Sequence, residues 1–161
     1  MAVSVGDKVP SATLMRKTAD GIEPVPTDEF FAGKKVVVFS VPGAFTPTCS
    51  AKHLPGFVKN ADAIRAKGVD AVACVSVNDA FVMDAWGKDQ DVGDKVIMLA
   101  DGSANFARAM GLELDLTERG LGVRGKRYAM VVEDGVVKDL FVEPTPGDFE
   151  VSTAEHVLGS L

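Results

Sequence analysis

Residues 34–50 read KKVVVFSVPGAFTPTCS, and this stretch decides the fold. Residues 36–39 form a continuous apolar, mostly β-branched run, which is typical of a strand buried on both faces of a sheet. Pro42 and Gly43 end the strand, because this pair favours a turn. The turn delivers the chain to Cys49, where a helical pattern begins.

The helical pattern covers residues 49–67, where apolar residues recur three or four apart and Gly68 stands at a typical helix end. Pro55 predicts an interruption or kink near the start of this helix. A second buried strand follows at residues 70–77. Strand, helix and strand in this order predict a βαβ unit with parallel strands and a right-handed crossover.

The rest of the chain extends this unit on both sides. The predicted elements are a short hairpin (residues 12–14 with 22–25), a helix capped at Asn78-Asp79 and running to Gly87, a strand at 96–100, a helix capped by Ser103 and ending at Gly111, a loop at 112–126, a hairpin (128–132 with 136–142) and a final helix opened by a capping box at 152–155. This order predicts an α/β fold with a mixed central sheet and helices on both faces. It is the layout of a thioredoxin-like domain with an N-terminal extension, here a single domain spanning residues 1–161.

The composition argues against nucleic-acid-binding and membrane-spanning proteins. The chain of 161 residues is long enough to bury a core without disulfides, and it carries a net charge of −6. A negative chain with interspersed charges argues against nucleic acid as the main partner. No apolar stretch approaches the length of a membrane span, and the opening MAVSVGDKVP lacks the pattern of a secretory signal, so we expect a cytoplasmic protein without membrane contact.

Cys49 is one of only two cysteines, which rules out a disulfide scaffold. By count alone, both cysteines read as free structural thiols in a reducing compartment. Cys49 is distinguished by its place after a buried strand and at a predicted helix start. The unpaired amides and the dipole at a helix start favour a thiolate, and a nearby cation would add to this effect.

The residues around Cys49 reproduce a known signature. Pro42, Thr46 and Cys49 match P-x-x-x-T-x-x-C, and the chain resembles the peroxiredoxins, in particular the type II or peroxiredoxin-5-like subgroup. The resemblance continues, in order, through the segments VPGAFTPTCS, KHLPGF, CVSVNDAFVMDAW, LADGSANFARAMGL and GLGVRGKRYAMVVEDG. It therefore covers nearly the whole chain.

The resemblance implies a thiol peroxidase with assigned roles. Cys49 would attack the peroxide and become a sulfenic acid, Thr46 would hydrogen-bond the thiolate and the peroxide, and Pro42 would shield the pocket. The resemblance selects Arg124 as the arginine that stabilises the thiolate. Arg119 and Arg127 lie in the same stretch, and Arg127 is expected to be structural or secondary.

The sulfenic acid must be reduced again, and Cys74 is the only internal candidate for a resolving cysteine. It lies in the predicted strand 70–77, where a buried cysteine behaves as a small inert hydrophobe. Bridging it to Cys49 would require local unfolding. The resemblance therefore favours an external thiol, glutathione or a glutaredoxin, or else thioredoxin, and leaves Cys74 as an alternative.

His53, four residues after Cys49, allows two other interpretations: a base in a cysteine hydrolase, or a metal ligand paired with Cys49. With one other histidine and no CxxC motif, the chain offers few zinc ligands, and nothing points to an orienting residue for a hydrolase. We expect His53 to be a helix residue near the pocket or a dimer surface. No metal, haem or flavin cofactor is implied.

Two other functions stay open on the sequence alone. A thioredoxin-like disulfide oxidoreductase is disfavoured by the missing CxxC motif, and a peroxide-responsive redox sensor or holdase would use oxidation of Cys49 to alter partner binding. The resemblance implies a homodimer that meets near the active-site loop, where Phe45 is a candidate contact. Peroxides and an external thiol would be the small partners.

Overall fold

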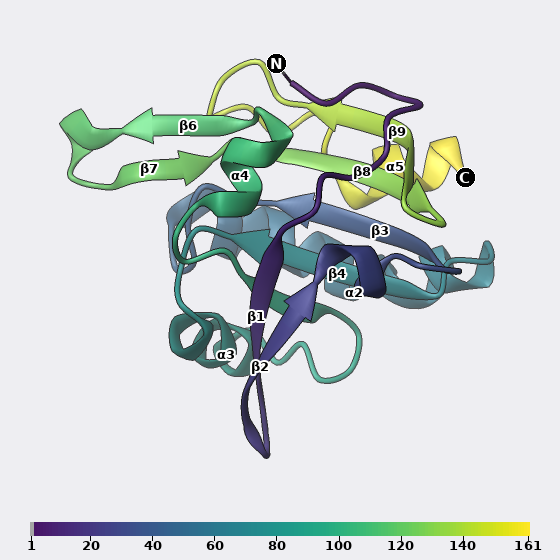
Figure 1. Ribbon diagram of the computed structural model, residues 1–161, viewed down its shortest axis with the longest axis horizontal. Helices are drawn as coiled ribbons and strands as arrows, with labels where there is room; N and C mark the ends of the chain where they lie inside the picture. The colour runs from purple at the N-terminus through teal and green to yellow at the C-terminus, as the bar shows by residue number, and fades with distance from the viewer. Residues whose placement is uncertain (1) are drawn as a thin grey trace.

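The structure, a computed structural model, describes residues 2–161. Over these residues the strands form a seven-stranded sheet in the order β2-β1-β5-β4-β3-β8-β9 and a two-stranded sheet of β6 and β7 (Figure 1). The strands are β1 (Thr13–Thr18), β2 (Gly21–Pro26), β3 (Lys35–Ser40), β4 (Ala71–Ser76), β5 (Ile97–Ala100), β6 (Glu113–Leu116), β7 (Gly122–Gly125), β8 (Tyr128–Glu133) and β9 (Val136–Val142). The helices are α1 (Thr27–Phe30), the π-helix η1 (Cys49–His53), α2 (Leu54–Ala66), α3 (Ala80–Asp89), α4 (Asn105–Met110), the 3₁₀ turn η2 (Thr117–Arg119) and α5 (Ala154–Ser160).

Strand β3 lies near the centre of the sheet, and its side chains alternate between two cores. Val37 and Phe39 belong to one buried cluster, together with apolar side chains of α2, α3 and α5. Val36 and Val38 belong to the cluster on the other face, with residues of α4 such as Phe106. Helices therefore cover both faces, and the mixed α/β, thioredoxin-like fold predicted from the sequence is confirmed.

The strand pairing agrees with the predicted βαβ unit. Strand β3 runs parallel to β4, and β4 runs parallel to β5. Strands β8 and β9 form an antiparallel hairpin whose turn places Asp134 at φ 48° and Gly135 at φ 79°. Two consecutive residues with positive φ are what a tight hairpin turn requires. The N-terminal extension is the hairpin β1–β2, which joins the sheet where Met15 pairs with Ala100.

The prediction of a loop at residues 112–126 is wrong. Strands β6 and β7 form a separate antiparallel hairpin joined by η2, and it projects beyond the main sheet (Figure 1). Exposed Glu113 and Asp115 alternate with more buried Leu114 and Leu116. This alternation of period two is a strand signal, but it covers only four residues, and high charge and three glycines obscure it.

Two helix caps also differ from expectation. Ser103 does not cap α4; the carboxylate of Asp101 accepts from the amides of Phe106 and Ala107 instead. Asp101 can do so because it follows directly after β5 and its side chain reaches the first turn of the helix. At α5, the hydroxyl of Thr153, one residue after the predicted Ser152, accepts from the His156 amide.

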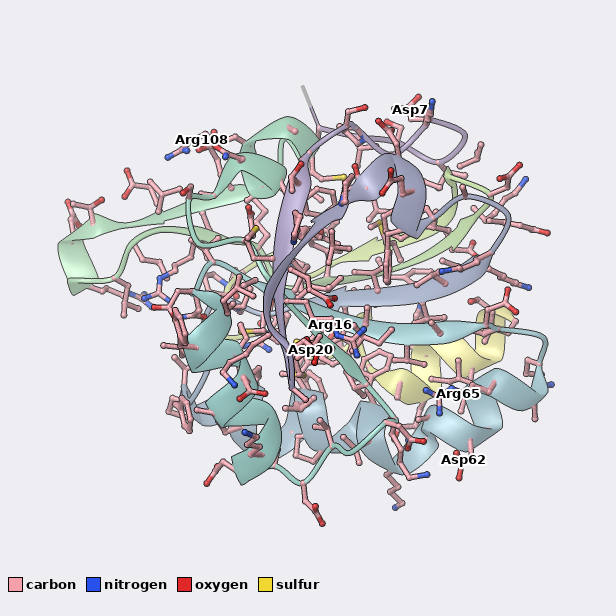
Figure 2. The ribbon with its side chains drawn as sticks, turned by 60° about the horizontal axis from the view of Figure 1, so that its bottom comes forward. Asp7, Arg16, Asp20, Asp62, Arg65 and Arg108 are labelled. Atoms are coloured by element: carbon pink, nitrogen blue, oxygen red, sulfur yellow. The ribbon has the colours of Figure 1, made fainter. Side chains whose placement is uncertain are left out.

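Polar contacts fasten the outer side of α2 to the segment before β5. Asp62 pairs with Lys95 at 2.9 Å, and Arg65 donates to the carbonyl of Asp94 at 2.8 Å. Figure 2 shows Asp62 and Arg65 near one another on this helix. None of the helices in the described part of the chain is both long and apolar enough to span a membrane.

Candidate active site around Cys49

A tight turn carries the chain from the end of β3 to Cys49. Thr46 holds the turn, because its hydroxyl donates to the carbonyl of Gly43 at 2.6 Å. The Ala44 amide donates to the side chain of Asn78 at 3.0 Å, which ties the turn to the end of β4. A Cβ at Gly43 would lie 2.7 Å from Nη1 of Arg124, so the close approach of that arginine requires glycine here.

Cys49 opens a π-helical turn, η1, which passes into α2 at Leu54. Pro55 lies in the first turn of α2, so the interruption predicted from this proline is confirmed. A π-helical turn has one more residue per hydrogen-bonded ring than an α-helix and often marks functional sites. It places both Cys49 and His53 toward the buried side, where each is 0% exposed.

A guanidinium group contacts the Cys49 thiol, and it belongs to Arg127. Nη2 of Arg127 donates to Sγ of Cys49 at 3.2 Å. Arg127 is itself buried, with 3% of its surface exposed. A hydrogen bond from a buried cation stabilises an anionic sulfur far more than a neutral donor would. The site therefore places a buried positive charge within hydrogen-bond distance of the Cys49 sulfur.

The expectation that Arg124 supplies this contact is wrong. Arg124 lies in β7 of the small sheet, paired with Leu114, and donates to the carbonyls of Leu121 and Pro42. Arg127 immediately precedes β8, whose first residue, Tyr128, pairs with Ser40 at the end of β3. This pairing places Arg127 beside the turn that leads to Cys49. The resemblance selected Arg124, three residues too early, and the position of Arg127 directly before the strand that pairs with β3 was the signal that could have found it.

Thr46 and Pro42 lie at the turn as expected, with one difference in contacts. The hydroxyl proton of Thr46 is directed to Gly43 and not to the Cys49 sulfur. The lone pairs of the Thr46 oxygen remain able to accept a hydrogen bond from a peroxide O–H. Pro42 is buried, and its carbonyl accepts from Nη1 of Arg124 at 3.3 Å. Arg124 therefore fastens the turn rather than the thiolate.

His53 makes two buried polar contacts that the sequence did not predict. Its Nδ1 lies 2.9 Å from Nη1 of Arg127, and its Nε2 lies 2.9 Å from the carbonyl oxygen of Ser152. Burial, with the charge of Arg127 as a second cause, lowers the pKa of His53 to about 3, although the bond to Ser152 opposes this shift. The imidazole is therefore neutral at physiological pH. With both ring nitrogens occupied by these partners, the hydrolase base and the metal ligand are disfavoured.

Cys74 lies in β4 at the position that pairs with Phe39, and both cysteines are free and buried. Burial raises the pKa of the Cys74 thiol well above its usual range, and the charge on nearby Cys49 adds to this effect. A protonated, buried thiol is a poor nucleophile.

Among residues 2–161 no group of three or more metal-binding side chains occurs.

Trp86 lies against the other side of the helix start. Its indole N–H donates to the hydroxyl of Ser50 at 3.0 Å, and the indole is fully buried. Phe45, at the tip of the turn, is 52% exposed, and its ring centroid lies 6.4 Å from that of Trp86. The single tryptophan of the chain therefore reports on the residue next to Cys49.

Comparisons with known proteins agree with the fold and place the chain in a family. The family model described as Redoxin matches residues 4–158. The chain is 50% identical to Peroxiredoxin-2E, chloroplastic, of Arabidopsis thaliana, an alignment that covers 99% of this chain and 70% of that protein. It is 53% identical to reduced Prx3 of Vibrio vulnificus, solved in complex with H2O2, with a TM-score of 0.94 and 98% of both chains covered. It is 35% identical to peroxiredoxin 5 from Alvinella pompejana, with a TM-score of 0.86 over 98% of this chain and 97% of that one. The chain matches the Redoxin model over residues 4–158 and the two solved peroxiredoxins over nearly their whole length, so it belongs to the peroxiredoxins of the Redoxin family, which are thiol-dependent peroxidases.

Proposed function

We propose that this peroxiredoxin reduces hydrogen peroxide and organic hydroperoxides through a sulfenic acid on Cys49. The observation that carries the proposal is the 3.2 Å hydrogen bond from Arg127 to the Cys49 sulfur inside a buried site. A thiolate is the nucleophile in this chemistry, and the buried cation favours it. The related Prx3 of Vibrio vulnificus was solved with H2O2 bound, which supports peroxide as the substrate class.

The peroxide step balances with the groups that the site supplies. The Cys49 thiolate attacks one peroxide oxygen, a sulfur–oxygen bond forms, and the oxygen–oxygen bond breaks. The leaving hydroxide or alkoxide takes up a proton and departs as water or an alcohol. Sulfur is oxidised by two electrons, the peroxide is reduced by two, and the product is the sulfenic acid. This step needs no metal, haem or flavin.

Three neighbours would guide that step. The guanidinium of Arg127 stabilises the negative charge as it moves from sulfur to the departing oxygen. The hydroxyl of Thr46, which donates to Gly43, accepts from the peroxide O–H and orients it. Buried Pro42 keeps bulk water away from the sulfur. Arg124 supports the turn through the Pro42 carbonyl and takes no direct part.

We also propose that an external thiol, glutathione or a glutaredoxin, returns the sulfenic acid to the thiol, with thioredoxin as a further candidate. The first thiol forms a mixed disulfide with Cys49 and releases water. A second thiol then attacks the sulfur of the first, which forms a disulfide between the two external thiols and releases reduced Cys49. The raised pKa of buried Cys74 disfavours that residue as the resolving thiol. Because Cys49 is also fully buried, a bulky reductant needs the start of the helix to open, and the π-helical turn is a suitable place.

The peroxide step is tested by stopped-flow mixing with hydrogen peroxide. Cys49→Ser must abolish the reaction, and continued consumption of peroxide by this variant would refute the proposed function. Arg127→Lys should slow the step by about 100-fold or more, because the guanidinium that donates to the sulfur while bound to His53 is lost. Arg124→Lys should cause a much smaller loss, and Arg119→Lys, at an exposed position of η2, should change the rate by less than about threefold.

Recycling is tested by mass spectrometry after one equivalent of peroxide, with and without glutathione. We expect a sulfenic acid on Cys49 that becomes a glutathione adduct when glutathione is present. Cys74→Ser should retain turnover supported by glutathione or glutaredoxin. An intramolecular disulfide between Cys49 and Cys74, together with loss of all recycling in Cys74→Ser, would contradict the external-thiol route.

We propose a homodimer that meets at the active-site face, because two large apolar side chains there are exposed: Phe45 by 52% and Phe81, at the start of α3, by 64%. Light scattering should give twice the monomer mass, and Phe81→Glu should reduce it to the monomer. A monomeric wild-type protein would overturn this proposal.

The cytoplasmic location stays a prediction that cell fractionation can test; one relative carries the description chloroplastic.

A further inference from the structure

Arg127 has three nitrogen positions, and each has a partner. Nη2 donates to the Cys49 sulfur, Nη1 lies 2.9 Å from Nδ1 of His53, and Nε lies 3.5 Å from the carbonyl of Pro146. The Pro146 contact is at the limit of a hydrogen bond, so His53 is the strong partner on this side. A planar guanidinium that is held at Nη1 can direct Nη2 in only a narrow range of angles.

The two contacts of His53 determine its protonation. A guanidinium only donates, so Nδ1 must accept, and a carbonyl only accepts, so Nε2 must carry the proton that bonds Ser152. Both conditions are met only by the neutral imidazole with its proton on Nε2. The lowered pKa of His53, about 3, agrees with this assignment.

The Ser152 carbonyl is itself held in place by a buried carboxylate. Oε2 of Glu143 accepts from the amides of Glu150, Val151 and Ser152 and from the Ser152 hydroxyl, at 2.6 to 2.9 Å. Burial alone would raise the pKa of Glu143, but these hydrogen bonds outweigh burial and lower it, so the carboxylate is charged. The loop before α5 is thereby fixed against His53.

We propose that His53 is a positioning residue of the peroxidase reaction: its neutral ring, oriented by the Ser152 carbonyl, accepts from Arg127 and thereby aims the guanidinium at the Cys49 sulfur. The inference rests on the proposed function and adds to it. It makes the segment from Glu143 to Ser152, near the C-terminus, part of what sets the reactivity of Cys49.

Another role for His53 is simple packing. Its ring centroid lies 5.0 Å from that of Phe39, 5.6 Å from that of Phe57 and 5.2 Å from that of Phe149. If packing is the whole role, a phenylalanine of similar shape should serve as well. If His53 acts on Arg127, the peroxide rate should depend on whether the side chain at position 53 has a hydrogen-bond acceptor where Nδ1 lies.

Three substitutions at His53 separate these roles. His53→Phe keeps an aromatic ring and removes both polar contacts. His53→Asn keeps an acceptor near the Nδ1 position, and His53→Gln keeps a donor near the Nε2 position. We expect His53→Phe and His53→Gln to lower the stopped-flow rate with hydrogen peroxide by about tenfold or more, because a hydrogen bond to a charged group is lost. His53→Asn should recover most of the rate, and His156→Asn, at the other, exposed histidine, should match the wild type.

A second measurement keeps the test valid if a variant packs poorly. The alkylation rate of Cys49 with neutral iodoacetamide depends on the thiolate but not on peroxide orientation by Arg127. A misdirected guanidinium therefore lowers the peroxide rate more than the alkylation rate, whereas general loosening of the site changes both. Fluorescence of Trp86 confirms that each variant folds.

The decisive experiment is a double-mutant cycle with Arg127→Lys. If His53 acts through Arg127, His53→Phe slows the wild type by about tenfold or more but slows the Arg127→Lys protein by less than about threefold. Equal slowing in both backgrounds, or a wild-type peroxide rate in His53→Phe, would overturn the positioning role. Failure of the proposed function is distinct, because it would show as a wild-type protein that does not consume peroxide through Cys49.

Discussion

Lowering the pH from 7 to 5 should destabilise this protein through a single buried side chain, His53. The folded protein holds the imidazole neutral, because burial and the Arg127 charge lower its pKa from 6.5 to about 3. The unfolded chain has no such restriction and takes up a proton near pH 6.5. Protons therefore favour the unfolded state, and stability falls as the pH drops from 6.5 towards 3.

The magnitude follows from the same two pKa values. At pH 5, which lies 1.5 pH units below 6.5, the unfolded state gains about 2 kcal/mol from binding the proton. Near pH 3 the full difference of 3.5 pH units would amount to roughly 5 kcal/mol. A loss of this size is a large fraction of the 5 to 15 kcal/mol that is typical of folded domains.

The assay is urea denaturation at pH 7 and pH 5, at one protein concentration, followed by the fluorescence of the single, buried Trp86. Wild type and His156→Asn should each lose about 2 kcal/mol more between the two pH values than His53→Asn loses. Wild type and His53→Asn share every other titrating group, so those groups cancel between them, and His156→Asn controls for the loss of a histidine elsewhere. If His53→Asn loses as much stability as the wild type, His53 is not the buried neutral group that we describe.

Four further substitutions test the fold by the same denaturation assay. Phe39→Ala should cost about 3 to 5 kcal/mol, because Phe39 is fully buried and stacks on Phe57 with ring centroids 4.1 Å apart; a cost below about 1 kcal/mol would contradict this packing. Asp101→Ala should cost about 1 to 2 kcal/mol through the lost cap of α4, while Ser103→Ala should stay within about 0.5 kcal/mol; the reverse order would restore Ser103 as the cap. Thr153→Ala should cost about 1 kcal/mol, and no measurable change would mean that α5 begins without this cap.

The central site owes its strength to hydrogen bonds that converge from three parts of the chain. Cys49 and His53 come from the π-helical turn, Arg127 from the segment before β8, and Ser152 from the loop before α5. Each contact is short, and each of these four residues is at least 97% buried, with Arg127 and Cys49 exposed by only 3% and 0%. Contacts that exclude water act in a medium of low effective dielectric, so small displacements of Arg127 have large effects on the thiolate.

The sequence by itself determined the local elements and the candidate nucleophile. The apolar run of β3, the helical spacing after Cys49 and the turn before β9 each depend on residues close together in the chain, so pattern and turn chemistry were enough. The signature of Pro42, Thr46 and Cys49 is likewise local, and it singled out Cys49 as the candidate reactive cysteine.

Only the tertiary structure decided which arginine meets that cysteine. Arg124 and Arg127 are identical in chemistry and three residues apart, and what separates them is the pairing of Ser40 with Tyr128, a contact between strands far apart in the chain. The same holds for His53, whose partners Arg127 and Ser152 lie 74 and 99 residues away. The β6–β7 hairpin was missed because its short strands carry little apolar signal. The local sequence pattern indicates which residues could belong to a buried polar network. Which of them bond to one another depends on strand register and on packing, and both are set by residues that are far apart in the sequence.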